Sequence, residues 1–389
     1  MKPSQIPEIC LLIILILIWA PLSCSDSGTP APTVLPVETA TPFSQQPAPM
    51  AVATASPSPS PIPRIPTATL FPTATATSSP SPTPDPTPPP TVATTPEMPP
   101  NELGQVMVLE YQHISRKGGK WGRTPEEFRQ DMEWLLAEGY YPINLRDFAA
   151  GWIEVPRGKS PVVLTFDDSY REQFNYLNGE GIDPYSAVGI LLEIHQRHPQ
   201  VWPLRATFFV LLNEEGKAPI PFGQPEYADR KLAQLVEWGM EIGSHTLTHP
   251  NFKETSLEEI RRQLAVSENL IEQKVPGYEV SSLSPPYGAY PEDLAILKAG
   301  EYEGLNYDFD AAVKVGGSPS PSPFSKQFDP YRINRIQGFQ EELDHWFGYF
   351  QSHPELRFVS DGNPMVVTVP EELPASLQGT LNPAALQSE

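Results

Sequence analysis

Short apolar runs alternate with amphipathic stretches between residues 101 and 389. The strand-like runs are VMVL (106–109), PINL (142–145), PVVLTF (161–166), RATFFVL (205–211), MEIGSH (240–245), RINRI (332–336) and PMVVTV (364–369). Strands that alternate with helices predict a parallel sheet covered by helices, which is an α/β fold. Over this length we expect a (β/α) barrel rather than an open sheet.

The stretches between these strands carry helix signals. Thr124 and Glu127 form a capping box, and Ser256 and Glu259 form a second one. Glycines stop several of the amphipathic patterns, as glycine commonly does at the end of a helix. The helices are therefore expected at 125–138, 226–238, 257–274, 291–300 and 340–351.

The N-terminus is typical of an export signal. The apolar run from Ile9 to Leu22 is short for a membrane span of ~20 residues and suits a signal peptide. Cys24 follows a small residue, Ser23, and resembles the lipid-modified cysteine of bacterial lipoproteins. We expect residues 1–24 to be a lipoprotein-type signal peptide, with a cleaved secretion signal or an uncleaved anchor as alternatives. All three place the chain outside the cytoplasm, either secreted or attached to the outer face of the membrane.

Residues 25–100 are rich in Pro, Thr, Ala and Ser and poor in charged and aromatic residues. Such a segment buries too little apolar surface to offset the entropy lost on ordering, and proline extends it. We expect a disordered linker, serving either as a stalk or as a neutral spacer. Residues 101–389 remain, and they suffice for one large domain with a buried core.

The net charge and the cysteine positions exclude one class of partner and two kinds of cysteine site. The formal net charge is −21, and no lysine or arginine cluster offsets it, so nucleic acid is not expected as a partner. Both cysteines, Cys10 and Cys24, lie in the N-terminal segment. The domain therefore has no disulfide and no cysteine-based metal site.

Two polar motifs follow predicted strands. Asp167 and Asp168 come directly after PVVLTF, and His245 and His249 come after the run that begins at Met240. A carboxylate and two imidazoles can hold a divalent ion such as Zn²⁺, with Co²⁺ or Ni²⁺ also fitting, and the second carboxylate remains as a general base. Two imidazoles four residues apart can reach one ion from one helical turn. Taken singly, the aspartates could cap a helix and the histidines could be two surface residues. Together they suit hydrolysis of an amide or an ester.

With these motifs, the sequence from about 106 to 340 resembles the polysaccharide deacetylases, the carbohydrate esterase family with the NodB homology domain. The resemblance implies an irregular (β/α) barrel and a metal-dependent hydrolase of carbon–nitrogen bonds other than peptide bonds. It implies that Asp167 is the catalytic base. It also implies that Asp168, His245 and His249 hold the metal.

A third motif of that family matches in part. Ser284-Pro285-Pro286-Tyr287-Gly288 stands where the family usually has Arg-x-Pro-Tyr-Gly, and the resemblance implies that the Tyr287 backbone N–H binds the oxyanion. The family's arginine orients the base, but this chain has Ser284 in its place. Arg332 and Arg335 are the candidates to replace it.

The general acid is the least determined residue. One branch of the family opens with Leu-x-Tyr-His, and its histidine protonates the leaving amine, whereas this chain has Gln112 there and His113 one position later. In a regular strand that shift turns a side chain to the opposite face. We predict His113 as the acid, with Asp308, Asp310 or a reaction that needs no strong acid as alternatives.

The resemblance implies an N-acetylated polysaccharide substrate that contains N-acetylglucosamine, such as peptidoglycan, a chitin-like chain or a poly-N-acetylglucosamine matrix. Two alternatives remain open. One is an esterase acting on O-acetyl groups, as on xylan. The other, suggested by Gln112 and Ser284, is a catalytically weakened, surface-displayed glycan-binding protein that keeps the metal site.

Overall fold

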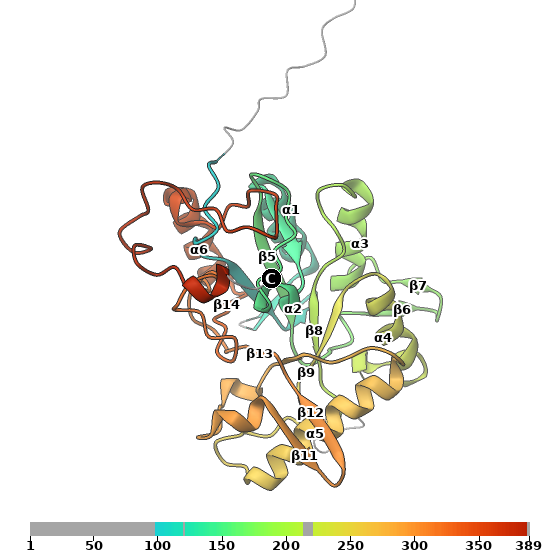
Figure 1. The fold of residues 1–389 in the computed structure, drawn as a ribbon. Coiled ribbons are helices and arrows are strands. Elements are labelled where there is room, and N and C mark those ends of the chain that lie inside the picture. Colours follow the sequence, from blue (N-terminus) through green and yellow to red (C-terminus); the bar gives the residue numbers. More distant parts are fainter. Residues whose placement is uncertain (1–97, 120, 213–220, 387–389) are drawn as a thin grey trace, which may run out of the picture. The chain divides into compact units, whose positions relative to one another are not determined.

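The computed structural model describes residues 98–119, 121–212 and 221–386 (Figure 1). The predicted signal peptide and nearly all of the predicted linker lie outside the described residues. Within the described part of the chain, no helix is both long enough and apolar enough to cross a membrane.

The centre of the domain is an eight-stranded sheet in which every strand pair is parallel. Seven strands follow the order β13-β10-β9-β8-β5-β1-β14. The eighth strand, β4, pairs with the first half of β5, and β8 pairs with the last two residues of β5. The strands are β1 (Met107–Tyr111), β4 (Tyr140–Ile143), β5 (Ser160–Phe166), β8 (Thr207–Val210), β9 (Glu241–Ser244), β10 (Ser282–Leu283), β13 (Ala311–Ala312) and β14 (Ile336–Gln337).

The two outermost strands of this sheet are joined by the chain just before β14. Val313 and Ile333 form a parallel bridge, and Ile333 exchanges backbone hydrogen bonds with Ala312 (3.0 Å) and Lys314 (2.8 Å). The segment 332–337, called the closing segment below, therefore pairs with β13 at its start and with β1 at its end. This curled, joined sheet confirms the predicted irregular (β/α) barrel.

Helices cover the outside of the curled sheet (Figure 1). They are α1 (Pro125–Ala137), α3 (Ala187–Arg197), α4 (Ala228–Glu237), α5 (Leu257–Lys274) and α6 (Gln340–Ser352). The short helix α2 (Leu145–Ala149) lies instead across the end of the barrel where strands begin. There the Leu145 N–H donates to Thr207 Oγ1 (3.0 Å) and the Arg146 N–H to Glu241 Oε2 (2.9 Å). The polar motifs lie at the opposite end of the barrel, where the strands finish.

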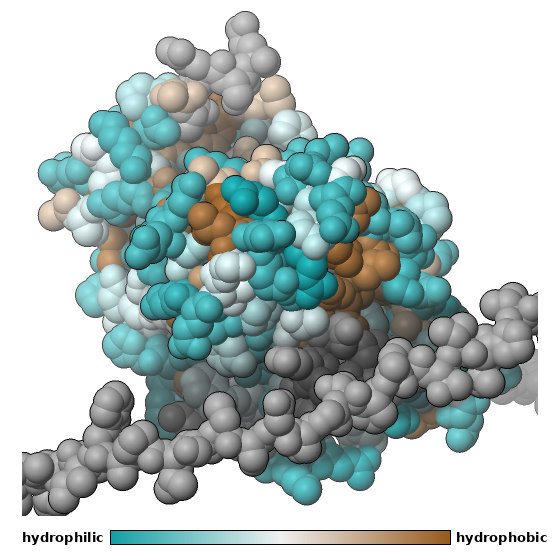
Figure 2. Space-filling view, turned by 90° about the horizontal axis from the view of Figure 1, so that it is seen from below, coloured by the Kyte–Doolittle hydropathy of each residue, from teal (hydrophilic) through white to brown (hydrophobic). Residues whose placement is uncertain are grey.

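The domain has two apolar cores, one on each side of the curled sheet. The larger core lies between the sheet and the outer helices, and a smaller one fills the barrel interior with residues that include Val108, Val163 and Phe209. The face of the molecule shown in Figure 2 is mostly hydrophilic with separate hydrophobic patches, as expected for a soluble surface.

Local signals account for several elements. The capping box of α1 is present in both directions, because Thr124 Oγ1 accepts from the Glu127 N–H and the Glu127 carboxylate accepts from the Thr124 N–H. The second capping box forms only in part. Ser256 accepts from the Glu259 N–H, whereas the Glu259 carboxylate binds Arg262 at 2.6 and 2.7 Å.

Two predicted elements are wrong. The helix expected at 291–300 is a single 3-10 turn, Leu294–Leu297, followed by the hairpin of β11 (Ala299–Tyr302) and β12 (Leu305–Asp308). Residues 364–369 form no strand. The Thr368 N–H donates to the Glu102 carboxylate, and the Thr368 carbonyl accepts from the Glu102 N–H. The prediction also missed α3 and the short pairs β2 (His113–Ile114) with β3 (Gly122–Arg123) and β6 (Tyr176–Leu177) with β7 (Gly181–Ile182).

Candidate active site

The polar motifs lie where the strands of the barrel finish. Asp167 and Asp168 follow the last residue of β5, His245 follows β9, and Ser284 follows β10. Because parallel strands finish at one edge of a sheet, these residues share the open end of the barrel. This is the end opposite α2.

Asp168, His245 and His249 converge on one point. Asp168 Oδ1 lies 3.3 Å from His245 Nε2 and 3.4 Å from His249 Nε2. One potential ligand atom from each residue lies within 4.8 Å of the other two. His245 Nδ1 is 2.7 Å from the Ser284 carbonyl oxygen, which can only accept, so Nδ1 carries the hydrogen and Nε2 presents its lone pair. The donor set fits a divalent cation of the zinc type.

The two histidines reach this point from a loop and not from a helical turn, which corrects the geometry expected from their spacing. Thr246 and His249 have positive φ angles of 70° and 59°, and Asp168 has 71°. Gln263 of α5 holds the loop, since its Oε1 accepts from the Leu247 N–H (3.0 Å) and the Thr248 N–H (2.8 Å). Such backbone conformations are costly for residues other than glycine and cluster at functional sites.

The electrostatic surroundings keep Asp168 ionised. Burial by itself would raise the pKa of Asp168. While the two imidazoles are protonated, the hydrogen bond and the positive charge of His245, together with the charge of His249, bring that pKa below its ordinary value. A carboxylate ready to bind a cation results.

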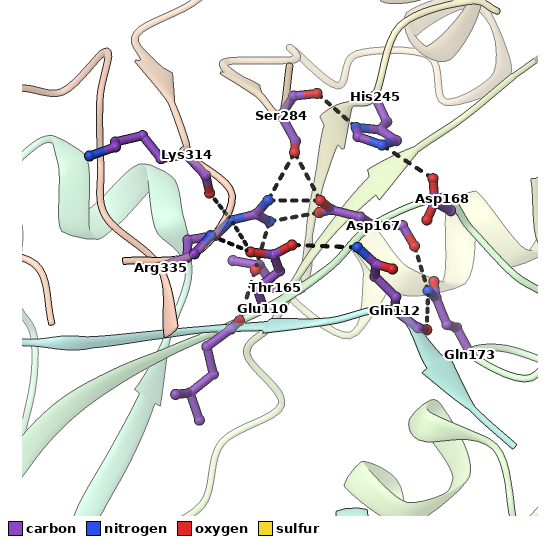
Figure 3. A network of polar contacts seen from close by, with 12 residues as sticks. Glu110, Gln112, Thr165, Asp167, Asp168, Gln173, His245, Ser284, Lys314 and Arg335 are labelled. Carbon is purple, nitrogen blue, oxygen red and sulfur yellow. Dashed lines mark hydrogen bonds and ion pairs between the residues drawn. The ribbon is translucent and has the colours of Figure 1, made fainter. Parts of the chain in front are cut away.

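Asp167 is held by Arg335 of the closing segment (Figure 3). Arg335 Nη1 and Nη2 donate to Asp167 Oδ1 (2.7 Å) and Oδ2 (2.8 Å), and Ser284 Oγ donates to Oδ2 at 3.0 Å. Arg335 Nε in turn donates to the Lys314 carbonyl at 2.6 Å. This forked geometry fixes the position of the carboxylate.

Of the two arginines considered from the sequence, only Arg335 reaches the aspartate. Its side chain is fully buried, whereas Arg332 is exposed and lies over the ring of Tyr290 at 5.6 Å. Ser284 is also buried and, being small, leaves space for the guanidinium that comes from the closing segment.

Glu110 is a site residue that the sequence analysis missed. Its Oε2 lies 3.5 Å from Arg335 Nε and accepts from the Gly316 N–H at 3.0 Å. Burial raises the pKa of Glu110, with the charge of Arg335 opposing that rise and the charge of Asp167 adding to it. A signal was present in the sequence, because alternation along β1 turns Glu110 to the same side as Val106 and Val108, which line the barrel interior.

Gln112 and His113 occupy different places. The Gln112 side chain faces Glu110, with Nε2 at 3.5 Å from Oε1. Gln173 Nε2 donates to the carbonyls of Gln112 (2.8 Å) and Asp167 (2.6 Å) and so ties the end of β1 to the end of β5. β1 ends at Tyr111, so the alternation expected of a continuous strand does not decide where His113 points.

His113 contacts the segment that directly follows Asp168. Its Nδ1 lies 2.6 Å from Glu172 Oε1, and its ring stacks on Tyr170 at 3.8 Å between centroids. The hydrogen bond with Glu172 raises the pKa of His113, burial partly opposes this, and the charges of Glu172 and Asp168 add to the rise.

The other acid candidates lie elsewhere. Asp308 is the exposed last residue of β12, and Asp310 precedes β13, with its N–H bound to the Ser281 carbonyl at the start of β10. Asp310 is thus at the end of the barrel where strands begin, away from the metal triad.

Tyr287 closes one side of the site. It lies in the 3-10 turn Pro286–Gly288 with a φ of 60°, and its side chain is 66% exposed. Its ring meets that of His249 edge-on at 4.5 Å between centroids. The Pro-Pro-Tyr-Gly turn therefore sits directly against the metal triad.

Part of this chain matches a known family. Residues 200–305, which include His245, His249 and the Pro-Pro-Tyr-Gly turn, match the family model described as polysaccharide deacetylase. The chain is 22% identical over 235 residues to YxkH of Bacillus subtilis, covering 59% of this chain and 70% of that protein.

Two further relatives match over shorter regions. Identity is 28% over 138 residues to the peptidoglycan-N-acetylglucosamine deacetylase of Bacillus cereus, covering 36% of this chain and 40% of that protein. It is 31% over 146 residues to the peptidoglycan-N-acetylglucosamine deacetylase PgdA of Listeria monocytogenes, covering 36% of this chain and 25% of that protein. The match thus spans less than half of each of these two enzymes.

Solved structures resemble the fold. The Streptococcus pyogenes deacetylase PplD, in complex with acetate, matches with 18% identity and a TM-score of 0.46, covering 62% of this chain and 98% of that chain. IcaB from Ammonifex degensii matches with 18% identity and a TM-score of 0.46, covering 64% and 97%.

Proposed function

Because residues 200–305 match the polysaccharide deacetylase family, we propose that this chain is a metal-dependent hydrolase that removes acetyl groups from an N-acetylated polysaccharide. The observation that carries the proposal is the pairing of two arrangements at one end of the barrel. Asp168, His245 and His249 form a cation site, and the adjacent Asp167 is fixed by Arg335.

Adjacent aspartates take different roles because their surroundings differ. Asp168 faces the two imidazoles and would hold the ion with them. Asp167 faces a guanidinium and a hydroxyl. We assign Asp167 as the general base that accepts a proton from the attacking water. Arg335 is a positioning residue for that base, and it replaces the arginine usual at the position of Ser284.

A divalent ion bound by the triad would polarise the acetyl carbonyl and lower the pKa of the attacking water. Zn²⁺ suits one carboxylate and two imidazoles, and Co²⁺ or Ni²⁺ would be accepted by the same donors. We assign the Tyr287 backbone N–H to stabilise the negative charge that develops on the carbonyl oxygen. The contact of the Tyr287 ring with His249 of the triad supports this assignment.

We propose His113 as the general acid. Glu172 accepts from Nδ1, so Nε2 of the protonated ring carries the hydrogen available to a leaving amine. Stacking on Tyr170 and the bond to Glu172 hold the ring on the segment that follows the two aspartates. Gln112, at the position usual for this histidine, has no proton that an amine could take.

Relatives named for peptidoglycan N-acetylglucosamine and chitooligosaccharide deacetylation support an N-acetylglucosamine-containing substrate. An O-acetyl esterase and a glycan-binding protein that keeps the metal are the alternatives to be separated by experiment. We further propose, from the apolar run before Cys24, that the protein is exported and carried on the membrane by a lipid anchor.

The test measures metal content and acetate release on the same purified variants. Asp167→Asn is expected to keep its metal and lose turnover, because the residue is the base and not a ligand. His249→Ala leaves two protein ligands, so its metal content is expected to fall steeply. Wild-type protein should release acetate from N-acetylglucosamine oligosaccharides, and less readily from acetylated xylan.

Full metal occupancy in His249→Ala would overturn the ligand assignment. A metal-loaded wild type that binds these oligosaccharides without releasing acetate would favour the glycan-binding alternative. Preferential release from acetylated xylan would identify the esterase instead.

A further inference from the structure

Lys231 is a buried lysine that the proposed chemistry does not use. It lies on α4 and is fully enclosed, and its Nζ donates to the Phe222 carbonyl at 3.0 Å. Three aromatic rings lie near the amine, those of Phe174, Tyr176 and Phe222, with centroids 5.6, 5.7 and 5.8 Å from Nζ. The amine is therefore enclosed among aromatic rings and directed at the backbone of Phe222.

An amine in this environment is costly. Burial lowers the pKa of Lys231 to about 7, with the charge of Arg171 adding to that fall and the charge of Glu226 opposing it. A methionine would fill a similar space without the loss of hydration that an amine suffers, so packing alone does not account for the lysine. What the lysine supplies, and methionine would not, is a hydrogen-bond donor for one backbone carbonyl.

Phe222 connects Lys231 to the turn that follows the two aspartates. The Phe222 N–H donates to the Ser169 carbonyl at 2.8 Å, and Phe222 has a φ of 62°. Asp168 and Ser169 have φ angles of 71° and 47°, so this turn also lies in the left-handed region. Residues other than glycine stay in that region only where their surroundings hold them. The bond from Phe222 is one of the contacts that hold this turn.

The end of β8 fixes the same turn from another side. Ser169 Oγ donates to the Leu211 carbonyl and accepts from the Leu211 N–H, both at 3.1 Å. The carbonyl of Ser169 is thus held by Phe222 and its hydroxyl by Leu211. Since Asp168 directly precedes Ser169, the direction in which its carboxylate faces the two histidines depends on these bonds.

We infer that Lys231 is a positioning residue for the proposed metal ligand Asp168, acting through Phe222 and Ser169. The inference rests on the proposed function, because it requires a cation at the triad. It adds that the affinity and geometry of the metal site depend on a donor that contacts none of the three ligands. Partners that orient metal ligands typically change affinity by ~10–100-fold, and the effect of this more distant donor is expected at the lower end of that range.

The test loads the purified protein with Co²⁺, whose visible absorption bands report the geometry of its ligands. Lys231→Met and Lys231→Arg are compared with wild type, and Ser360→Ala is the matched control. Ser360 Oγ also donates to a backbone carbonyl, that of Val155, at 2.8 Å in a buried environment. The Ser360 N–H donates to the carbonyl of Lys159, directly before β5, so this control lies at the end of the barrel away from the site.

Lys231→Met is expected to bind Co²⁺ about tenfold more weakly than wild type and to shift the absorption bands at full occupancy, because Asp168 is less firmly oriented. Lys231→Arg keeps a donor and should restore most of the affinity and the wild-type bands. Ser360→Ala should lower the melting temperature and leave the affinity and the bands unchanged. Wild-type affinity and bands in Lys231→Met would overturn the inference, as would an equal shift in Lys231→Arg or in Ser360→Ala.

Folding and the proposed function are judged separately. If Lys231→Met did not fold, Lys231→Gln would carry the test, because its amide donor stands one bond closer to the backbone than the amine of lysine. Shifted bands in that variant support the inference, and wild-type bands overturn it. A wild type that bound no Co²⁺ would overturn the proposed metal site and this inference together, whereas Co²⁺-loaded wild type with an unaffected Lys231→Met would overturn the inference alone.

Discussion

At the scale of single residues, the site depends on which partner each ionisable group meets. Asp167 and Asp168 are neighbours in sequence, yet one meets a guanidinium and the other meets two imidazoles. His113 meets Glu172. The proposed division into base, ligands and acid therefore rests on contacts and not on residue type.

The acid assignment predicts different outcomes for two leaving groups. His113→Ala should slow N-deacetylation by ~10²–10⁴-fold, as for removal of a general acid. Ester hydrolysis should suffer much less, because an alkoxide leaves more readily than an amide anion. The comparison uses one N-acetyl and one O-acetyl substrate, with Gln112→His as a third protein.

The pH profile adds a second readout for the same residue. An acid must be protonated, so the rate falls as pH rises through the pKa of His113, which Glu172 raises. In Glu172→Gln that pKa drops, and the alkaline fall in rate should move to lower pH. An undiminished N-deacetylation rate in His113→Ala would rule out this acid, and a large gain in Gln112→His would favour the family's usual position.

At the scale of elements, the closing segment joins the fold to the chemistry. It pairs with β13 and β1 and brings Arg335 into the barrel between them. The family's usual arginine would come from the position of Ser284, which lies after β10 and also contacts Asp167. Two different elements can thus supply a guanidinium to the same carboxylate.

This equivalence predicts a rescue. Arg335→Met leaves Asp167 and Glu110 without their cation and should lower kcat by at least ~10²-fold, as for a misplaced catalytic group. Adding Ser284→Arg to that variant should restore part of the activity, since the space left by Arg335 admits the new side chain. Acetate release and melting temperature are measured together, with Arg332→Met as the matched control.

If the double variant recovered stability without activity, the two positions would not be equivalent in catalysis. If Arg332→Met lost as much activity as Arg335→Met, the assignment of the orienting arginine would be wrong.

Sequence reasoning succeeded where the determining contacts are local. The α1 helix was predicted because Thr124 and Glu127 cap each other, and the metal triad was found because its residues follow strand ends. It failed at 291–300, where Pro and Gly signals suggested a helix but Gly300 lies in β11 against the Tyr307 ring. The roles of Arg335 and Glu110 could not be assigned, because Arg335 meets Asp167 only through closure of the barrel.

At the scale of the whole molecule, the start of the described chain is fastened to its C-terminal part. Asn101 N–H donates to the Val359 carbonyl (2.9 Å), Glu102 N–H to Thr368 (2.8 Å) and Gln105 N–H to Leu356 (2.7 Å). The Glu102 carboxylate also accepts from the backbone of Asp361 and Thr368. The domain boundary expected at residue 101 stays a prediction, which truncation on either side of these contacts can test.

Truncation tests that boundary. A protein that begins at residue 98 should match the full chain in melting temperature and in acetate release from soluble oligosaccharides. One that begins at residue 106 loses these three backbone bonds and should be destabilised by about 3 kcal/mol or more, at ~1 kcal/mol per bond. Thermal unfolding measures both, and equal stability of the two truncated proteins would place the boundary further along the chain.

The position of Arg335 late in the sequence also affects the order in which the site is assembled during synthesis. During synthesis, Asp167 and the residues of the metal triad emerge well before the segment that closes the barrel. A nascent chain that has not reached Arg335 holds two carboxylates, Asp167 and Glu110, with no counterion in an unclosed barrel. On the proposed function, the base cannot be aligned before Arg335 is in place, so hydrolytic competence would arrive only with the final turn of the barrel.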